Sequence, residues 1–273
     1  MENLSKAKHL VADADVMIIV AGNGMAKLEG LDLLGQASFA QDFPTIAEKY
    51  HVNSVGEALD QQSASWSDKW LCWSQLIAHY SLEYQPSQTM KNLRKLIGQK
   101  KFFIATSSFG HFFESAGFNE NRIFNVFGDW TKMQCSSGIN HGLRDSRGAV
   151  QKILTAKQQK QDLAAAFVPK CKKCGQPMEI HMPLNEHFYP DTDANTRFRW
   201  FLTGNEEEKT VFLELGVDET SPQLLQPIIH LVQQYPQWSY VAADYRQEQL
   251  PLDIQARSAG VNADSAILLQ NLL

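Results

Sequence analysis

Two cysteines separated by two residues, Cys171 and Cys174, are the clearest candidates for chemistry in this sequence. Two thiolates at this spacing can bind one tetrahedral zinc ion from a single turn. Cys135 lies upstream, and His141 is a chemically suitable fourth ligand. The pattern therefore predicts a zinc site made of these residues. Two alternatives stay open at this point: the thiols are unligated at the surface, or His141 faces the solvent.

A glycine-rich turn is the second candidate. The apolar run at residues 16–20 leads into Ala-Gly-Asn-Gly at residues 21–24, as a strand leads into a phosphate-binding turn. Glycines there let the backbone approach a pyrophosphate, and the start of the following helix offers unpaired N–H groups. Lys27 and Glu29 are unusual residues for such a turn. They are compatible with such a turn if both side chains lie on the outer face of the following helix.

Further apolar runs end near polar or small residues. They cover residues 101–106, 122–127, 210–216 and 238–243. Such runs are typical of strands buried on both faces of a parallel sheet, which binds its ligands at the carboxyl ends of its strands. The candidate ligand-binding residues at these ends are Ala21, Gly22, Asn23, Gly24, Met25, Ser107, Ser108, Gly110, Gly216, Val217, Asp218 and Ala243.

Helical segments, such as residues 3–14, 90–98 and 224–234, alternate with these runs. The alternation predicts an α/β protein with a doubly wound, Rossmann-like parallel sheet, and we take residues 238–243 as its last strand. The region from Phe39 to Tyr84 is helical and aromatic, and the turn-rich segment that follows residue 129 holds three of the four cysteines. We expect a Rossmann-like domain at 1–38, 86–134 and 207–273, an inserted helical module at 39–85, and a small zinc-ribbon-like module at 135–206.

The composition limits the classes of function. The chain has 273 residues, of which 44% are hydrophobic and 20% charged, so it is typical of a folded, globular protein. Its net charge of −5 argues against nucleic acid as the main partner. No apolar stretch approaches the ~20 residues that a membrane span needs. The N-terminus lacks a signal peptide, so we expect a cytoplasmic protein that binds neither nucleic acid nor membrane.

Taken in order, these motifs resemble those of the sirtuin family. Sirtuins have a strand that ends in Gly-Ala-Gly, an inserted helical module, a Thr-Gln-Asn-x-Asp strand end, a zinc module and a late Gly-Thr-Ser-type loop. The corresponding residues of this chain are Ala21-Gly22, Thr106–Gly110, Cys135 with Cys171 and Cys174, and Gly216–Pro222. The resemblance covers nearly the whole chain. It implies a Rossmann-like NAD-binding domain and a structural zinc ion.

The class M, macrodomain-linked branch of bacterial sirtuins is more similar still. Its Gly-Asp-Tyr…Gln-Cys-Ser resembles residues 128–136, and its Glu-Leu-Gly-Val-Gly-x-Asn-Thr-Pro resembles residues 214–222. Its Asn-Val-Asp-His-Gln-Phe…Ala-Gly-Phe resembles residues 108–118, and its Pro-x-Cys-Pro-x-Cys-Gly-x-x-Met resembles residues 169–178. This branch is associated with protein ADP-ribosylation, reportedly of lipoyl-carrier proteins beside a partner macrodomain.

The departures from the family pattern lie where the chemistry is expected. Ser108 and Gly110 stand where sirtuins have the Asn and Asp that bind the nicotinamide and ribose end of NAD. Phe127 stands where deacylases have a His general base, and a phenyl ring cannot accept a proton. Ile139 replaces the second cysteine of the first zinc pair, and Asp218 with its neighbour Glu219 replaces Gly- and Asn-like positions.

These observations leave several functions open. The resemblance implies an NAD-dependent protein ADP-ribosyltransferase that modifies a protein acceptor, for example a lipoylated carrier protein, with a macrodomain protein as a partner. The lost groups favour instead a module that binds NAD, ADP-ribose or a protein without turnover. Lysine deacylation comes last, because Phe127 cannot serve as its base.

Candidates for the missing polar groups are Glu29, Asp32, His111, Glu114 and Asp129. We prefer His111, because it follows a predicted strand and matches the class M string, and we expect it to position ribose or the acceptor. Its structural alternative is a capped loop histidine. Asp129 is the second predicted catalytic residue, and it could instead cap a helix.

Overall fold

A six-stranded parallel sheet forms the base of the molecule in this computed structural model, which describes residues 2–60, 63–160, 167–217, 224–245 and 247–273. The strand order is β3-β2-β1-β7-β8-β9, and every pairing in the sheet is parallel. The strands are β1 (Val16–Ala21), β2 (Lys101–Thr106), β3 (Ile123–Asn125), β7 (Thr210–Leu215), β8 (Trp238–Ala243) and β9 (Ser258–Val261).

The predicted doubly wound sheet is confirmed, and the sequences of its central strands match their burial. All side chains of β1, β7 and β8 are buried, which explains their continuous apolar runs. The prediction that residues 238–243 form the last strand is wrong, because β9 extends the sheet by one more strand. Strand β9 is short and made of small residues, so it carries no apolar run.

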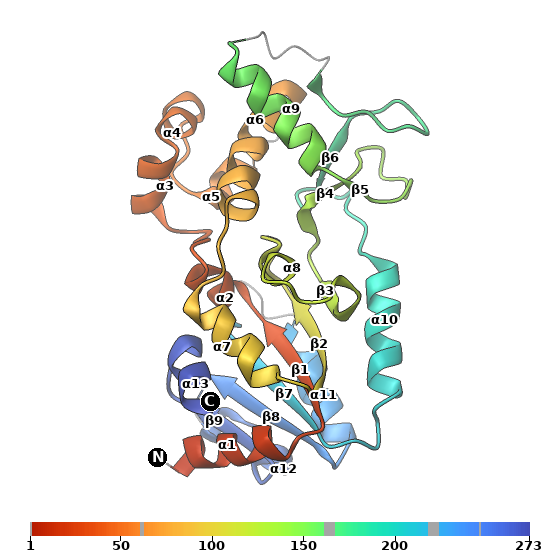
Figure 1. Cartoon of the computed structure of the whole chain (residues 1–273). Helices are drawn as coiled ribbons and strands as arrows, with labels where there is room; N and C mark the ends of the chain where they lie inside the picture. The colour runs from red at the N-terminus through yellow and green to blue at the C-terminus, as the bar shows by residue number, and fades with distance from the viewer. Residues whose placement is uncertain (1, 61–62, 161–166, 218–223, 246) are drawn as a thin grey trace.

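Helices cover both faces of this sheet (Figure 1). One face packs on α1 (Glu2–Asp13), α7 (Gln88–Ile97) and α13 (Ser265–Leu272), which share a core with β1 residues such as Met17 and Ile19. The other face packs on α10 (Thr192–Thr203), α11 (Leu225–Gln234) and α12 (Leu252–Gln255). Helix α10 lies in the segment that the sequence indicated as turn-rich.

A second unit lies beyond the carboxyl ends of these strands (Figure 1). Its three-stranded antiparallel sheet has the order β5-β4-β6, with β4 (Asp129–Cys135), β5 (Arg144–Asp145) and β6 (Met178–His181). The helices around it are α3 (Gln36–Asp42), α4 (Pro44–Tyr50), α5 (Val55–Leu59), α6 (Trp66–Ile77) and α9 (Arg147–Gln158). Helix α6 packs on α9, and Trp70 of α6 donates its indole N–H to the carbonyl of Met178 at 2.8 Å.

The strands that follow β1 in the chain, β2 and β3, extend the sheet on one side, and β7, β8 and β9 extend it on the other. The loops after β1 and β7 therefore meet at the switch point in strand order. The Gly24 N–H donates to the Gly216 carbonyl at 2.8 Å. A Cβ on Gly22 would lie 2.1 Å from the same carbonyl oxygen. The glycines of the first turn are therefore required by contact between two loops.

Two short helices follow strands of the large sheet: α2 (Asn23–Leu28) comes after β1, and α8 (Phe112–Ser115) comes after β2. A π-helical turn continues α6 at Ala78–Leu82, and single 3₁₀ turns lie at Glu120–Arg122 and Gln247–Gln249. Within the described ranges, every helix is too short or too polar to cross a bilayer.

Candidate functional site

A group of three cysteines and one histidine lies at the edge of the small sheet. The ligand atoms of Cys135, His141, Cys171 and Cys174 all lie within 4.8 Å of one another. The Sγ atoms of Cys135 and Cys174 are 3.4 Å apart, and Cys171 Sγ is 3.3 Å from His141 Nδ1. The structure thus brings all four predicted ligands together, including the histidine whose place in the set was open from the sequence.

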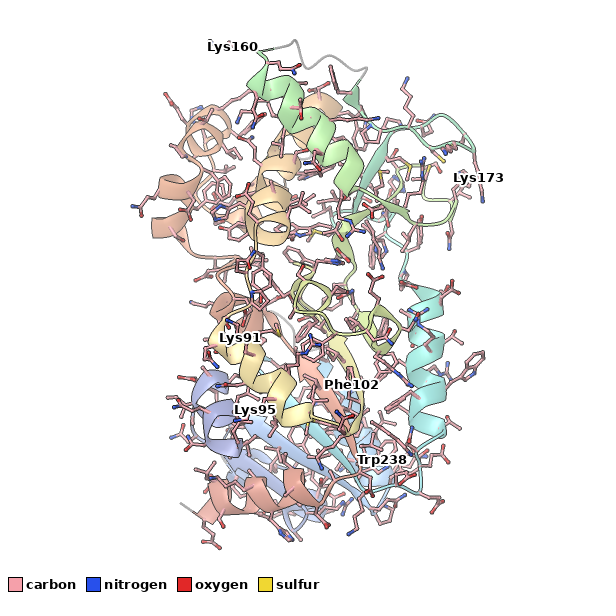
Figure 2. The ribbon with its side chains drawn as sticks, viewed as in Figure 1. Lys91, Lys95, Phe102, Lys160, Lys173 and Trp238 are labelled. Carbon is pink, nitrogen blue, oxygen red and sulfur yellow. The ribbon has the colours of Figure 1, made fainter. Side chains whose placement is uncertain are left out.

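The electrostatics of Cys171 suit a metal ligand. Burial raises the pKa of its thiol, but hydrogen bonds from the backbone N–H groups of Cys174 and Lys173 outweigh this effect and bring the pKa to about 6. Figure 2 labels Lys173 at the outer edge of the second unit, which contains the three-stranded sheet, and shows sulfur atoms near it. Three thiols and one imidazole in this arrangement are compatible with a structural zinc ion.

The two unusual residues of the first turn have different environments. Lys27 is exposed and forms an ion pair with Asp32 at 2.9 Å. Glu29 is buried, and its carboxylate accepts hydrogen bonds from the Tyr84 hydroxyl and from the N–H and hydroxyl of Ser87. The condition of an outer-face position is therefore met by Lys27 but not by Glu29. The buried carboxylate is stable there because these donors compensate its lost hydration.

The end of β2 differs from what the family pattern would require. The hydroxyls of Ser107 and Ser108 are buried and have no hydrogen-bond partner among the described residues. At Gly110, a Cβ would lie 2.3 Å from the ring of Phe112, so this ring fills the space that a side chain would need. The Gly110 carbonyl accepts a hydrogen bond from Ser81 at 2.7 Å, which fixes the turn to the helical module.

His111 follows directly and is held by Asp129. Its backbone is left-handed, with φ of 61°, and its Nδ1 lies 2.8 Å from Asp129 Oδ2. Asp129 Oδ1 accepts from the N–H and the hydroxyl of Thr131 at 2.8 and 2.7 Å. Both predicted catalytic residues are thus in direct contact. Asp129 begins strand β4, so the alternative that it caps a helix is wrong. The side chain of His111 likewise makes no cap bond to α8.

A second carboxylate, Glu114 of α8, lies beside this pair. Its Oε2 is 3.7 Å from His111 Nδ1, and its Oε1 accepts a hydrogen bond from Asn125 at 2.9 Å. Burial and the charge of Asp129 raise the pKa of Glu114. Burial would lower the pKa of His111, but the hydrogen bond to Asp129 and the two carboxylate charges raise it.

A cavity of about 440 Å³ opens beside His111. It is lined by the β4–β5 region and by the segment that leads into α10, and its charged residues include Lys132, Arg144, Asp145, Arg147, Asp191 and Arg197. Both signs of charge are present, so the lining suits a polar ligand. His111 is thereby accessible from a space large enough for a small molecule or a side chain of a partner.

The remaining predicted site residues are at the expected strand ends. Ala21 ends β1, Ala243 ends β8, and Gly216 and Val217 follow β7. Asn23 and Met25 belong to the short helix α2. Asp218 lies outside the described residues.

Sequence reasoning missed one buried acid. Glu214 lies in β7, where it accepts a hydrogen bond from the Tyr240 hydroxyl. Burial, with a smaller contribution from the charge of Asp244, raises the pKa of Glu214 to about 8. A carboxylate inside the apolar run Val-Phe-Leu-Glu-Leu was the available signal.

Comparisons with known proteins find two relatives in sequence and several solved structures of similar fold. No family model matches the chain. A protein ADP-ribosyltransferase of Staphylococcus aureus (strain Mu50 / ATCC 700699) is 25% identical over 268 residues, which are 96% of this chain and 84% of that protein. A probable bifunctional ADP-ribose hydrolase/ADP-ribosyltransferase of Fusarium oxysporum f. sp. cubense is 23% identical over 239 residues; they span 82% of this chain but 39% of that protein.

Solved structures define the class of fold. The crystal structure of a Sir2 homolog–NAD complex superposes with a TM-score of 0.61 and 16% identity, covering 98% of this chain and 91% of that one. A mutant Sir2 homologue in complex with ADP-ribose has a TM-score of 0.61 and 15% identity, covering 98% and 94%. The chain therefore has the sirtuin fold.

Proposed function

We propose that this protein is an NAD-dependent protein ADP-ribosyltransferase built on the sirtuin fold. The staphylococcal relative that bears this activity in its name matches 96% of the chain, and the structural neighbours include complexes with NAD and with ADP-ribose. The large sheet supplies the switch point at which doubly wound proteins bind nucleotides. The Cys135 cluster supplies a structural zinc site that holds the small sheet together.

The contact between His111 and Asp129 carries this proposal. Phe127 cannot accept a proton, so an active enzyme needs another polar group at the carboxyl end of the sheet. Asp129 holds Nδ1 of His111 at 2.8 Å, which leaves Nε2 as the nitrogen available to a ligand. A buried carboxylate that fixes one tautomer and one orientation of an imidazole is the usual way to position such a group.

The residues near the end of β2 fit a polar ligand group. Ser107 and Ser108 bury hydroxyls that lack a protein partner among the described residues, and a buried hydroxyl without a partner is costly. A bound NAD would supply the ADP-ribosyl group and the nicotinamide leaving group. We assign the two serines to binding at that end, and His111 to orienting ribose or the acceptor.

The finer details of this proposal rest on the class M resemblance. They are a lipoylated carrier protein as acceptor, a macrodomain protein as partner, and a cytoplasmic location. We do not propose lysine deacylation, since Phe127 leaves that chemistry without its base.

One observation favours a second candidate, binding of NAD or ADP-ribose without turnover. The ring of Phe112 fills the space beside Gly110, where sirtuins carry a polar side chain. A phenyl ring offers no hydrogen bond to a carboxamide. If this ring keeps the nicotinamide end out, the protein would hold the nucleotide without cleaving it.

Calorimetric titration with NAD and with ADP-ribose, followed by an assay of nicotinamide release with a lipoylated carrier protein, separates these functions. The transferase proposal predicts NAD binding, nicotinamide release and a mass increase of the carrier. Binding without release would support the second candidate, and the absence of binding by either nucleotide would overturn both.

A further inference from the structure

We propose that His111, Glu114 and Asp129 form a second metal site, which binds one divalent transition-metal ion at the edge of the 440 Å³ cavity. Their ligand atoms all lie within 4.8 Å of one another. His111 Nδ1 is 2.8 Å from Asp129 Oδ2 and 3.7 Å from Glu114 Oε2, so one imidazole nitrogen faces two carboxylates. The site shares His111 and Asp129 with the function proposed above, but its test measures metal binding and not turnover.

Burial gives the first physical argument. The side chain of Glu114 is 5% exposed and that of Asp129 is 1% exposed. Two carboxylates that lie this close in a buried site repel each other and lose hydration, unless a positive charge compensates them. Around a neutral imidazole the two carboxylates carry a charge of −2, which a divalent cation neutralises.

The unsatisfied oxygen of Glu114 gives the second argument. Oε1 accepts a hydrogen bond from Asn125, whereas the buried Oε2 has no partner among the described residues. This oxygen faces His111 Nδ1. A buried carboxylate oxygen without a donor is expected where a ligand completes its interactions.

Two of the cations that line the same cavity have other partners. Arg147 pairs with Asp145, and Lys132 lies 4.0 Å from Asp191. Neither side chain forms a described ion pair with Glu114 or Asp129. The hydroxyl of Thr131, 3.2 Å from His111 Nδ1, offers one more oxygen near the proposed site.

The donor set selects the class of metal. One imidazole with two carboxylates suits Mn²⁺, Fe²⁺, Co²⁺ or Zn²⁺ rather than a soft thiophilic ion, and the adjoining cavity leaves room for water or a ligand. The cation would replace the proton that lies between His111 Nδ1 and Asp129 Oδ2. By contrast, the cysteine-rich cluster in the small sheet disfavours Mn²⁺, because its ligands are mainly thiolates.

Mn²⁺ therefore distinguishes the two clusters. Zinc-replete full-length protein is titrated with Mn²⁺, and binding is measured both by calorimetry and by the loss of the free Mn²⁺ electron paramagnetic resonance signal. We expect about one Mn²⁺ per chain with the zinc content unchanged. No binding of Mn²⁺ to the folded, zinc-replete protein would overturn the proposal.

Glu114→Gln keeps the size of the side chain and removes its charge, so we expect Mn²⁺ affinity to fall at least about tenfold. Asp145→Asn is the matched control, because Asp145 lines the same cavity but pairs with Arg147 outside the cluster. The control should bind Mn²⁺ as the wild type does. If both variants are folded by circular dichroism and lose binding equally, the ion is held by the general charge of the cavity, and the proposal is wrong.

Discussion

Two loop regions at the carboxyl ends of the large sheet are held in place by different kinds of contact. Between β1 and β7, two glycine turns are locked together by backbone contact, in which Gly24 donates to Gly216. At the end of β2, polar and aromatic side chains fill the turn, with Phe112 beside Gly110 and His111 bonded to Asp129. The first region is held by its backbone, as a framework of the parallel sheet, and the second is held by contacts between side chains.

The largest effect is expected in the framework. Gly22→Ala places a methyl group 2.1 Å from the Gly216 carbonyl oxygen, which belongs to the backbone and cannot rotate away. We expect a loss of ~4 kcal/mol or more in the free energy of unfolding, measured by urea denaturation. The control Gly148→Ala meets no atom within 4 Å in helix α9 and should stabilise slightly. If the first variant is as stable as the control, the two loops are not locked.

Removing a cysteine tests the zinc cluster, which lies outside both loop regions. Cys171→Ser should lose about one zinc per chain and lower the melting temperature of the small sheet, as measured by elemental analysis and thermal unfolding. Cys72→Ser is the control, because Cys72 is buried in α6 away from the cluster. Zinc retained by the first variant, or lost from both, would contradict the assignment of ligands.

Glu214 makes the framework sensitive to pH. Its pKa is raised from 4.5 to about 8 in the folded protein, so folding takes up a proton between these values. Wild-type stability should therefore fall as the pH rises from about 4.5 to about 8, by a few kcal/mol in total. Glu214→Gln should lose most of this slope in urea denaturation at a series of pH values. An unchanged slope would show that Glu214 is ionised in the fold.

A smaller effect is expected where the first turn meets the helical module. Tyr84→Phe removes one donor from the buried carboxylate of Glu29, while Ser87 keeps its hydrogen bonds. We expect a loss of ~1–2 kcal/mol in chemical denaturation. A variant as stable as the wild type would indicate that water replaces the hydroxyl.

The features of the fold and of the site that depend on spacing within a short segment could be predicted from the sequence. Buried runs defined five of the six strands, and the Cys-x-x-Cys pair led to the ligand set that the structure assembles. What it missed depends on contacts between distant segments. Glu29 is buried by a tyrosine 55 positions away, and His111 meets Asp129 only because β4 starts the second sheet beside α8. No spacing in the chain indicates that Phe112 turns back onto Gly110.

Nicotinamide release by wild type and His111→Gln most directly tests whether the His111–Asp129 pair at the end of β2 takes part in the cleavage of NAD. Both proteins are first titrated with NAD, so that binding and turnover are measured separately. We expect equal NAD affinity and a nicotinamide release at least ~10²-fold slower in the variant. A variant that releases nicotinamide at the wild-type rate would contradict the role of the His111–Asp129 pair.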